Sequence, residues 1–243
     1  MFGMNEITKP FSDGPGDTFL VNDIFYTIQG EGPDAGRPAI FIRLAKCNLR
    51  CYFCDTEFEQ FITMTTDGVI ARVLELSQIH KCRLAVITGG EPLLQNIFWL
   101  VTRLNVAQVT VTVETAGTVW VNDLDILFKV RRESSPYQNA LICSPKTGRL
   151  EPRLAKIVHA LKYIINEGET SKEDGLPVKS TQLQGTPLTI ARPNQCPYAD
   201  VYVQAQDTGN DERSARNLVL AATIAMQYGY RLSVQLHKLA QLP

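Results

Sequence analysis

The chain lacks three features that mark large classes of proteins: a long apolar run, an excess of charge of one sign, and an apolar N-terminal segment. No apolar run approaches the roughly 20 residues that a membrane-spanning helix needs. The 24 Lys and Arg residues are balanced by 25 Asp and Glu residues, which leaves no basic footprint for duplex nucleic acid. Residues 1–18 are polar and rich in Gly, Pro and Asp, unlike a secretory signal peptide. We therefore expect neither a membrane protein nor a secreted or nucleic-acid-binding one.

The remaining composition is that of an ordinary globular protein, with 243 residues of which 44% are hydrophobic and 20% charged. A prior of roughly 100–200 residues per domain allows one or two domains, and α/β barrels of this length are often single. Such a chain buries an adequate core without metal or disulfide crosslinks, so a bound metal would have a function beyond folding. Because no export signal is evident, we expect a cytoplasmic location, where thiols stay reduced.

Six cysteines are the feature that departs from this composition, because three of them crowd into eight residues. The clustered three are Cys47, Cys51 and Cys54, and the dispersed three are Cys82, Cys143 and Cys196. Clustered cysteines in a cytosolic protein are interpreted first as metal ligands rather than as disulfide partners. We expect the dispersed three to be plain buried or loop thiols.

The spacing Cys47-x3-Cys51-x2-Cys54 favours an iron–sulfur cluster. Thiolates hold such clusters, usually four of them, and here no fourth cysteine or histidine lies in the same stretch. A 4Fe-4S cube held by three cysteines keeps one iron open to a small chelating ligand, such as the amine and carboxylate of an amino acid. A structural zinc ion needs a closed set of four ligands, for which only His80 and Cys82 stand further along the chain. Zinc binding and chance clustering are the alternatives.

Short apolar, β-rich runs alternate with helical patterns along the chain. Strands are predicted at residues 22–28, 39–44, 84–88, 109–113, 141–144, 161–165, 200–204 and 232–236. Helices are predicted at residues 67–79, 92–104, 153–158 and 211–228. This alternation is typical of βα units around a parallel sheet.

We predict an α/β fold, a partial (β/α)6 barrel of the TIM type, as a single domain over residues 21–243. Residues 1–20 are interpreted as an N-terminal extension, and residues 166–199, rich in Pro, Gln, Thr and Gly, as an insertion. Polar clusters follow the carboxyl ends of the predicted strands: Gln29-Gly30-Glu31, the cysteines, Thr88-Gly89-Gly90-Glu91, Glu114-Thr115, Ser144-Pro145-Lys146 and Gln204. Because barrel enzymes assemble their active sites on that face, we expect these clusters to share one site.

Gly89-Gly90-Glu91-Pro92 is a weaker signal than the cysteines. By itself it indicates a glycine turn followed by a proline that begins a helix. Placed after a strand in a chain that also carries the three-cysteine spacing, it favours a ligand site. Glycines let the backbone approach a ligand, and a carboxylate or carbonyl accepts hydrogen bonds from an ammonium group.

The cysteine spacing and the glycine motif together resemble those of the radical S-adenosylmethionine (SAM) superfamily. The resemblance implies a partial barrel of the radical SAM type and a 4Fe-4S cluster whose open iron binds the methionyl end of SAM. Reduction of that cluster would cleave SAM to a 5′-deoxyadenosyl radical, chemistry that belongs to the cofactor. An aromatic residue before the third cysteine, here Phe53, is typical of the superfamily, and the resemblance implies that its backbone contacts the adenine.

Four segments narrow the resemblance to the 7-carboxy-7-deazaguanine synthase family. They are residues 25–32 (FYTIQGEG), 37–43 (RPAIFIR), 54–56 (CDT) and the ending from His237 to Pro243. The match runs in order from about residue 22 to the last residue and leaves out the predicted extension and insertion. It implies conversion of 6-carboxy-5,6,7,8-tetrahydropterin to 7-carboxy-7-deazaguanine with loss of ammonia, a carbon–nitrogen lyase step of queuosine and 7-deazapurine biosynthesis.

The same resemblance implies a role for individual residues. Those expected to bind SAM are Phe53, Cys54, Asp55, Gly90, Glu91, Ser144, Pro145, Lys146, Gln204 and Asp207. Those expected to bind the pterin are Ile28, Gln29, Gly30, Glu31, Arg43, Thr88, His237 and Pro243. Glu31 would accept from the guanidine-like edge of the pterin, and Arg43 would pair with its carboxylate. Mg²⁺ is implied at Thr56, since a hard cation takes oxygen ligands.

The resemblance also implies a small-molecule pterin substrate, an electron donor such as flavodoxin or ferredoxin, and a homodimer. Two departures from the family pattern are Gln204-Ala205, where Gln-Pro is usual, and residues 238–242 (KLAQL). One alternative is another radical SAM activity, such as a glycyl-radical activase with a protein partner. A second is a non-catalytic interaction module that binds zinc or a cluster. A colourless protein with stoichiometric zinc after anaerobic purification would favour this module, and a brown protein would exclude it.

Overall fold

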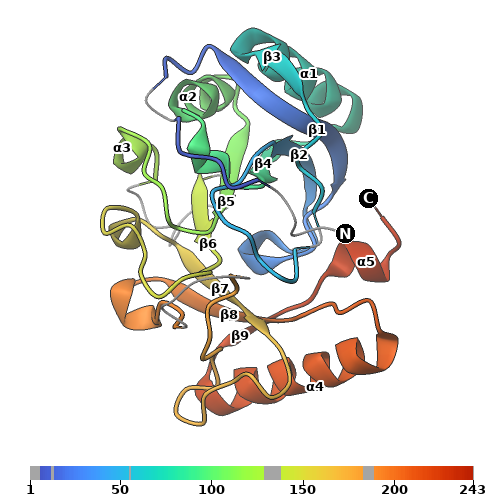
Figure 1. The fold of residues 1–243 in the computed structure, drawn as a ribbon. Coiled ribbons are helices and arrows are strands. Elements are labelled where there is room, and N and C mark those ends of the chain that lie inside the picture. The colour runs from blue at the N-terminus through green and yellow to red at the C-terminus, as the bar shows by residue number, and fades with distance from the viewer. Residues whose placement is uncertain (1–5, 12–13, 55, 129–137, 183–188, 243) are drawn as a thin grey trace.

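A computed structural model describes residues 6–11, 14–54, 56–128, 138–182 and 189–242 of the chain. Within these residues nine strands form one curved sheet in the order β3-β1-β2-β4-β5-β6-β7-β8-β9 (Figure 1). Neighbours are parallel from β2 to β9, whereas β1 runs antiparallel to both β2 and β3. The order has two ends, so the sheet is an open, partial barrel.

The strands and helices alternate as the sequence pattern indicates. The strands are β1 (Thr18–Ile28), β2 (Pro38–Leu44), β3 (Ile62–Thr65), β4 (Leu84–Gly89), β5 (Thr110–Thr115), β6 (Ala140–Cys143), β7 (Ala160–Ile165), β8 (Asp200–Ala205) and β9 (Arg231–Ser233). The α-helices are α1 (Thr66–His80), α2 (Phe98–Val106), α3 (Leu124–Phe128), α4 (Asp211–Tyr228) and α5 (Leu236–Leu239). None of the described helices combines the length and apolar character that a bilayer crossing requires.

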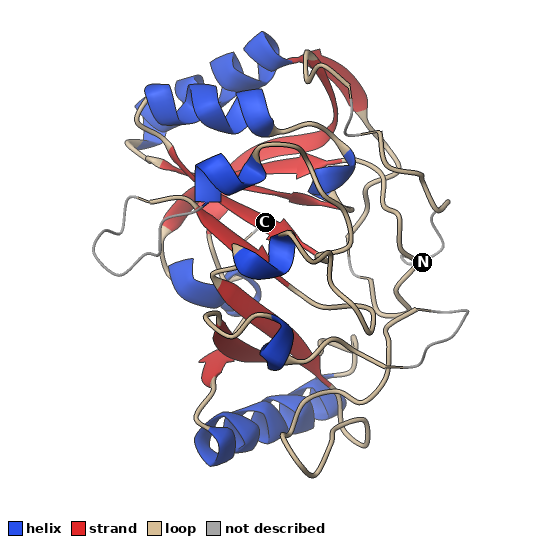
Figure 2. Cartoon of the chain, turned by 90° about the vertical axis from the view of Figure 1, so that its left-hand side faces the viewer, coloured by secondary structure: helices blue, strands red, loops and turns tan. Residues whose placement is uncertain are grey.

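Helices cover the outside of the sheet, with α1 and α2 at one end and α4 at the other (Figures 1 and 2). The central parallel strands β4, β6 and β7 are buried on both faces, which explains their nearly continuous apolar sequences. Helix ends follow local chemistry: the Asn210 side chain accepts from the Arg213 N–H at the start of α4, and Gly229 ends that helix with a φ of 71°. These strands and helices form the packed scaffold from which the loops of the site extend.

The predicted fold class is confirmed, because β2 and β4 to β8 form the six expected parallel strands. Several boundaries differ from the prediction, and strand β3 was not predicted. The predicted helix at 92–104 is a 3-10 turn, Pro92–Leu94, followed by α2, since the Gln95 side chain instead bonds to the backbone of Leu20. The predicted helix at 153–158 is only the 3-10 turn Leu154–Lys156, and the strand at 232–236 ends at Ser233, before α5 begins.

One expectation about the sheet is wrong: Gln29-Gly30-Glu31 does not follow a strand of the parallel set. Because β1 is antiparallel to β2, its last residue, Ile28, pairs with Pro38 at the amino end of β2. The loop of residues 29–37 instead turns into the barrel interior. Asp34 accepts a hydrogen bond from Thr112 in the middle of β5 at 2.8 Å. The loop thus reaches the site from the opposite end of the sheet.

The predicted extension and insertion both pack on the barrel where they are described. β1 begins at Thr18, inside the predicted extension, because Phe19 and Val21 bury their side chains in the core. Further upstream, the Thr8 N–H donates to the Cys47 carbonyl at 2.9 Å. In the 166–199 stretch, Leu176 and Ile190 are buried, which shows that its two described parts contribute to the core.

Candidate active site

One cavity of about 570 Å³ is lined by residues of β1, β2 and β4 to β8 together with the loop that follows β2. Its lining includes these predicted residues: Ile28, Gln29, Glu31, Arg43, Cys47, Cys51, Phe53, Cys54, Thr56, Thr88, Gly90, Ser144, Lys146, Gln204, Asp207 and His237. Gly30, Glu91 and Pro145 stand outside this lining, while Asp55 and Pro243 lie outside the described residues. Most of the predicted site residues, which come from separate segments of the chain, therefore line the same cavity.

The cysteine loop (residues 46–54) carries three free thiols, of which Cys47 is buried and the other two half-buried. The loop turns away from β2 at Lys46, whose φ of 72° is unusual for a residue with a side chain. The Glu91 N–H holds this turn by donating to the Lys46 carbonyl at 2.9 Å. Backbone contacts from other parts of the chain, rather than the loop's own structure, thus fix its course.

These thiols suit an iron–sulfur cube better than a single metal ion. Among the described residues, no three His, Cys, Asp or Glu side chains lie close enough together to bind one ion. A cube requires no such convergence, since each of its three thiolates binds a different iron. Burial, with the nearby Glu91 charge, raises the pKa of the Cys47 thiol far above its usual range. Iron binding therefore has to displace that proton.

Gly89 and Gly90 let the end of β4 pass directly against the cysteine loop. Gly89 has a φ of 133°, which residues with side chains rarely adopt. A Cβ on Gly89 would overlap the Leu44 carbonyl oxygen, and one on Gly90 would overlap the Lys46 carbonyl oxygen. The pair therefore sets the separation between β4 and the loop, and leaves bare backbone at the cavity.

The Glu91 carboxylate is fully buried behind this glycine turn. It accepts hydrogen bonds from the Thr115 hydroxyl and the Ala116 N–H, both at 2.8 Å, and from the Leu93 N–H at 3.0 Å. Burial raises the pKa of Glu91, and these hydrogen bonds oppose that rise. Glu91 thus ties the glycine turn to the end of β5, with its carboxylate turned toward the protein.

Ser144 and Lys146 link strand β7 to the cysteine loop. The Ser144 hydroxyl donates to the Lys162 carbonyl on β7 at 2.9 Å, and the Lys146 ammonium donates to the Ser144 hydroxyl at 2.7 Å. The same ammonium lies 5.1 Å from the ring centre of Phe53 in the cysteine loop, a cation–π distance. Burial lowers the pKa of Lys146, and the nearby Lys162 charge adds to that effect.

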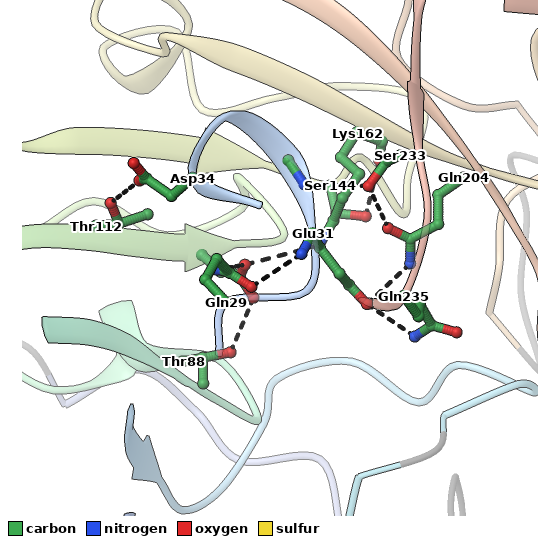
Figure 3. A network of polar contacts seen from close by, with 12 residues as sticks. Gln29, Glu31, Asp34, Thr88, Thr112, Ser144, Lys162, Gln204, Ser233 and Gln235 are labelled. Carbon is green, nitrogen blue, oxygen red and sulfur yellow. Dashed lines mark hydrogen bonds and ion pairs between the residues drawn. The ribbon is translucent and has the colours of Figure 1, made fainter. Parts of the chain in front are cut away.

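Glu31 is the centre of a polar group that we call the carboxylate network, formed by Gln29, Glu31, Thr88, Glu114, Lys162, Gln204, Ser233 and Gln235 (Figure 3). Lys162 pairs directly with one oxygen of Glu31. The side-chain amides of Gln204 and Gln235 donate to the other oxygen at 3.0 and 2.7 Å. The Ser233 hydroxyl in turn donates to Gln204 at 2.9 Å. Residues of three strands thus orient a single carboxylate.

Glu114 forms the second half of the carboxylate network. It accepts from the Gln29 amide at 3.0 Å and from the Thr88 hydroxyl at 3.3 Å, and it lies 3.8 Å from the Lys162 ammonium. The Lys162 side chain is only 8% exposed, so its charge is compensated by the two carboxylates rather than by bulk water. One cation between two carboxylates leaves this wall of the cavity with a net negative charge.

The electrostatics of Glu31 follow from its neighbours. Burial alone would raise the pKa of Glu31, but the Lys162 charge and the hydrogen bonds from Lys162 and Gln235 outweigh it, so the pKa falls well below its usual range. Glu31 is therefore a carboxylate at neutral pH and accepts hydrogen bonds only. A ligand group facing it has to be a donor.

Arg43, which pairs with Thr88 across β2 and β4, lines the same cavity with an unmet donor. Its guanidinium carbon lies 5.0 Å from the ring centre of Phe25, and its buried Nε has no hydrogen-bond partner among the described residues. A planar guanidinium held against a ring is suited to pair with a carboxylate. Thr56 also lines the cavity, and the Cys54 thiol contacts its carbonyl at 3.6 Å.

The C-terminal helix α5 covers one side of the cavity. A Cβ on Gly30 would overlap His237, and the Leu236 N–H donates to the Gly30 carbonyl at 3.2 Å, so a glycine is needed where α5 meets the loop of residues 29–37. Lys238 pairs with Asp207 at 2.7 Å and fastens the helix to the end of β8. His237 is thereby held at the cavity.

The expectations from the sequence miss several members of the carboxylate network, above all Lys162 and Gln235. Lys162 is the one charged residue in the apolar strand sequence ALKYII, and a lysine in a strand buried on both faces needs a partner. That signal was present in the sequence. Gln235 and Ser233 carry none, because they reach Glu31 and Gln204 only through the pairing of β8 with β9.

Comparisons with known proteins agree with this geometry. Residues 41–181 match the family model of the radical SAM superfamily. The 7-carboxy-7-deazaguanine synthase of Rhodospirillum rubrum is 40% identical, with 100% of both chains covered. That of Rickettsia prowazekii is 35% identical over 98% of this chain and 94% of its own. The crystal structure of QueE from Escherichia coli, at 20% identity, has a TM-score of 0.61 and covers 90% of this chain and 94% of that one, which shows a shared fold.

The partial barrel, the cysteine loop and the glycine turn thus define a radical SAM enzyme, with a 4Fe-4S cluster and SAM as its cofactors. Similarity along the whole length of the chain then identifies its family within this superfamily. The chain belongs to the 7-carboxy-7-deazaguanine synthase family. The alternatives of an activase or a non-catalytic module find no support in these matches.

Proposed function

We propose that the protein converts 6-carboxy-5,6,7,8-tetrahydropterin to 7-carboxy-7-deazaguanine with loss of ammonia, as a carbon–nitrogen lyase of 7-deazapurine biosynthesis. The observation that carries the proposal is one cavity that is lined both by three clustered thiols and by a largely buried, oriented carboxylate. The thiols suit the radical SAM cofactors, and the carboxylate suits a purine-like or pterin ring edge. Full-length similarity to the synthases of two bacteria supports the same assignment.

We assign the cluster to Cys47, Cys51 and Cys54, and SAM to the surrounding cavity wall. The bare backbone of Gly90 and the Ser144 and Lys146 side chains are in place for the charged end of SAM. When bound, the cluster and SAM supply a 5′-deoxyadenosyl radical for hydrogen abstraction. The protein's part is to hold both reactants and exclude water from the cavity.

The pterin edge would bind the carboxylate network, and its carboxylate would bind Arg43. The edge presents several N–H donors, which match the oxygens of Glu31 and Glu114, and the network's net negative charge matches a guanidine-like group. The orphaned Nε of Arg43 matches the substrate carboxylate. Gln204 would act here by orienting Glu31 rather than by contacting the adenine, because its amide is already bonded to Glu31 and Ser233.

We propose further that Mg²⁺ binds at Thr56, which lines the cavity together with Cys54. Oxygen ligands and retained water are typical of this ion, and substrate oxygens would complete its coordination. The roles of Asp55 and Pro243 stay proposals from the family resemblance. We also propose a cytoplasmic homodimer that is reduced by flavodoxin or ferredoxin. Its single radical SAM domain would begin near residue 21 and include residues 166–199.

An anaerobic turnover assay tests the proposal. Cluster-reconstituted protein is incubated with SAM, a reductant, Mg²⁺ and 6-carboxy-5,6,7,8-tetrahydropterin, and products are identified by mass spectrometry. We expect 7-carboxy-7-deazaguanine, with no product when the pterin or SAM is left out. Formation of 5′-deoxyadenosine without the deazapurine would refute the substrate assignment and leave the radical SAM assignment standing.

A further inference from the structure

The stretch of residues 166–199 contacts the cysteine loop through Thr181 and Gln182. Gln182 forms an antiparallel β-bridge with Cys51, and the Tyr52 N–H donates to the Thr181 carbonyl at 3.0 Å. The Thr181 N–H donates to the Lys146 carbonyl at 3.1 Å. These backbone contacts give the segment a defined register beside the second cysteine of the loop.

Both side chains point at the sulfur of Cys51. The Thr181 hydroxyl lies 3.0 Å from Cys51 Sγ, and the Gln182 side-chain amide donates to the same sulfur at 3.3 Å. The Arg50 N–H donates to the side-chain oxygen of Gln182 at 2.8 Å. Because this oxygen is turned toward Arg50, the side-chain nitrogen of Gln182 faces the sulfur. Thr181 is buried, so water competes little for its hydroxyl, and its alternative acceptor, the Lys146 carbonyl, is further away at 3.4 Å.

The surroundings of Cys47 differ, because its sulfur accepts from the Leu49 N–H at 3.4 Å, a donor within the cysteine loop itself. A thiolate bound to iron carries no proton and accepts hydrogen bonds only. At Cys51, both Thr181 and Gln182 then become donors to one sulfur. Hydrogen bonds to cluster sulfurs stabilise the added electron and raise the reduction potential.

We propose that Thr181 and Gln182 are positioning residues that raise the reduction potential of the cluster by donating hydrogen bonds to the Cys51 sulfur. The inference rests on the proposed function, since it requires the cluster. Residues 166–199 would thereby set how readily the enzyme accepts its one electron from an external flavodoxin- or ferredoxin-type donor. No covalent bond forms or breaks in that step.

The test is a potentiometric titration of the reconstituted holoenzyme followed by EPR. Thr181→Val and Gln182→Leu remove one donor each at nearly constant volume. A hydrogen bond to a charged acceptor is worth about a tenfold change in an equilibrium constant, so each midpoint should fall by about 59 mV for this one-electron couple. Thr181→Ser keeps the hydroxyl and should keep the wild-type potential.

Ser180→Ala is the matched control, since it removes a neighbouring hydroxyl that donates to the Lys146 carbonyl and accepts from the Gln182 N–H, while the Gln182 side-chain donor to sulfur stays in place. Its potential should equal that of the wild type. Unchanged potentials in both Thr181→Val and Gln182→Leu at full iron content would overturn the inference. So would an equal fall in Ser180→Ala, which would indicate a general effect of the segment.

A second readout needs no variant. Pulsed EPR on the reduced wild-type enzyme, with glutamine side-chain amides labelled with ¹⁵N, should show a nitrogen coupled to the cluster spin. Absence of that coupling would overturn the inference even where a variant fails to keep its cluster. Failure of the wild-type chain to bind any cluster would instead refute the proposed function and the inference with it.

Discussion

The cysteine loop and the carboxylate network face the same cavity but are built in opposite ways. The network draws its side chains from β4, β5, β7, β8 and β9 and from two loops, and its hydrogen bonds are made within the protein. The cysteine loop presents three soft thiol ligands on a turn that is held by backbone contacts from other segments. One wall is therefore held together by side-chain bonds within the protein, and the other presents ligands suited to a metal cofactor.

The difference indicates how the work of the enzyme is divided. Side chains on packed strands hold their geometry to fractions of an ångström, which recognition of a planar substrate requires. A loop with three thiols gains its final geometry from metal binding, because the ligands lose their protons as iron binds. Under the proposed assignment, substrate recognition resides in the fold, and radical generation resides in the assembled cofactor.

Cys51→Ala should have the largest effect on activity and a small effect on the fold. Removing the thiolate leaves too few ligands for the cluster, so product should fall to background. The half-buried Cys51 contributes little core packing, so the midpoint of thermal unfolding of cluster-free protein should stay near that of the wild type. Iron analysis and circular dichroism measure the two effects. A variant that loses both cluster and fold would contradict the separation of the two walls.

Lys162→Met should break the carboxylate network. It leaves the Glu31 carboxylate, whose side chain is only 14% exposed, without its cation, and loss of one partner of a buried ion pair costs about 3–5 kcal/mol of unfolding free energy. Urea unfolding measures this loss. Adding Glu31→Gln to the variant should restore a substantial part of the stability but not the binding of the pterin. Equal stability of the single and double variants would show that Lys162 acts by packing alone.

Acid should weaken the network through Glu31. Its pKa is lowered on folding, so the stability that it contributes is present above about pH 4.5, the unfolded value, and is lost as the pH falls toward the lowered folded value. The difference in unfolding free energy between wild type and Glu31→Gln should be flat at neutral pH and shrink in acid. Measurements on cluster-free protein keep cluster loss out of the comparison. A difference that grows in acid would contradict the lowered pKa.

Lys238→Ala should have the smallest effect, because the Asp207–Lys238 pair is more than a third exposed. Such a pair contributes about 0–1 kcal/mol, and less at high salt. The KM for the pterin should rise a few-fold as α5 loosens, with kcat little changed. Thr223→Ala on the exposed face of α4 is the control and should leave both constants unchanged. A large fall in kcat would indicate that α5 takes part in the chemistry.

The parts of the site that the sequence predicts are local in the chain. The cysteine spacing, the glycine turn and Ser144-Pro145-Lys146 each lie in one short segment, so their proximity to a strand end follows from the α/β pattern. Strand periodicity likewise predicts the six parallel strands. These features depend on neighbours a few residues away, which a single sequence shows directly.

The parts that it does not predict depend on distant pairing. The direction of β1 decides from which end Gln29 and Glu31 enter the barrel, and alternation of apolar residues is the same for parallel and antiparallel strands. The pairing of β8 with β9 brings Ser233 to Gln204, and the contact of Gln182 with Cys51 spans 131 residues. No local pattern encodes such contacts, so the carboxylate network emerges only in the folded chain.

The most direct test of this division measures two products in one anaerobic reaction, 5′-deoxyadenosine and 7-carboxy-7-deazaguanine, for wild type, Cys51→Ala and Lys162→Met. The account predicts both products from the wild type and neither from Cys51→Ala. From Lys162→Met it predicts 5′-deoxyadenosine with little deazapurine, because the radical still forms but the pterin is not held. Wild-type yields of the deazapurine from Lys162→Met would contradict it.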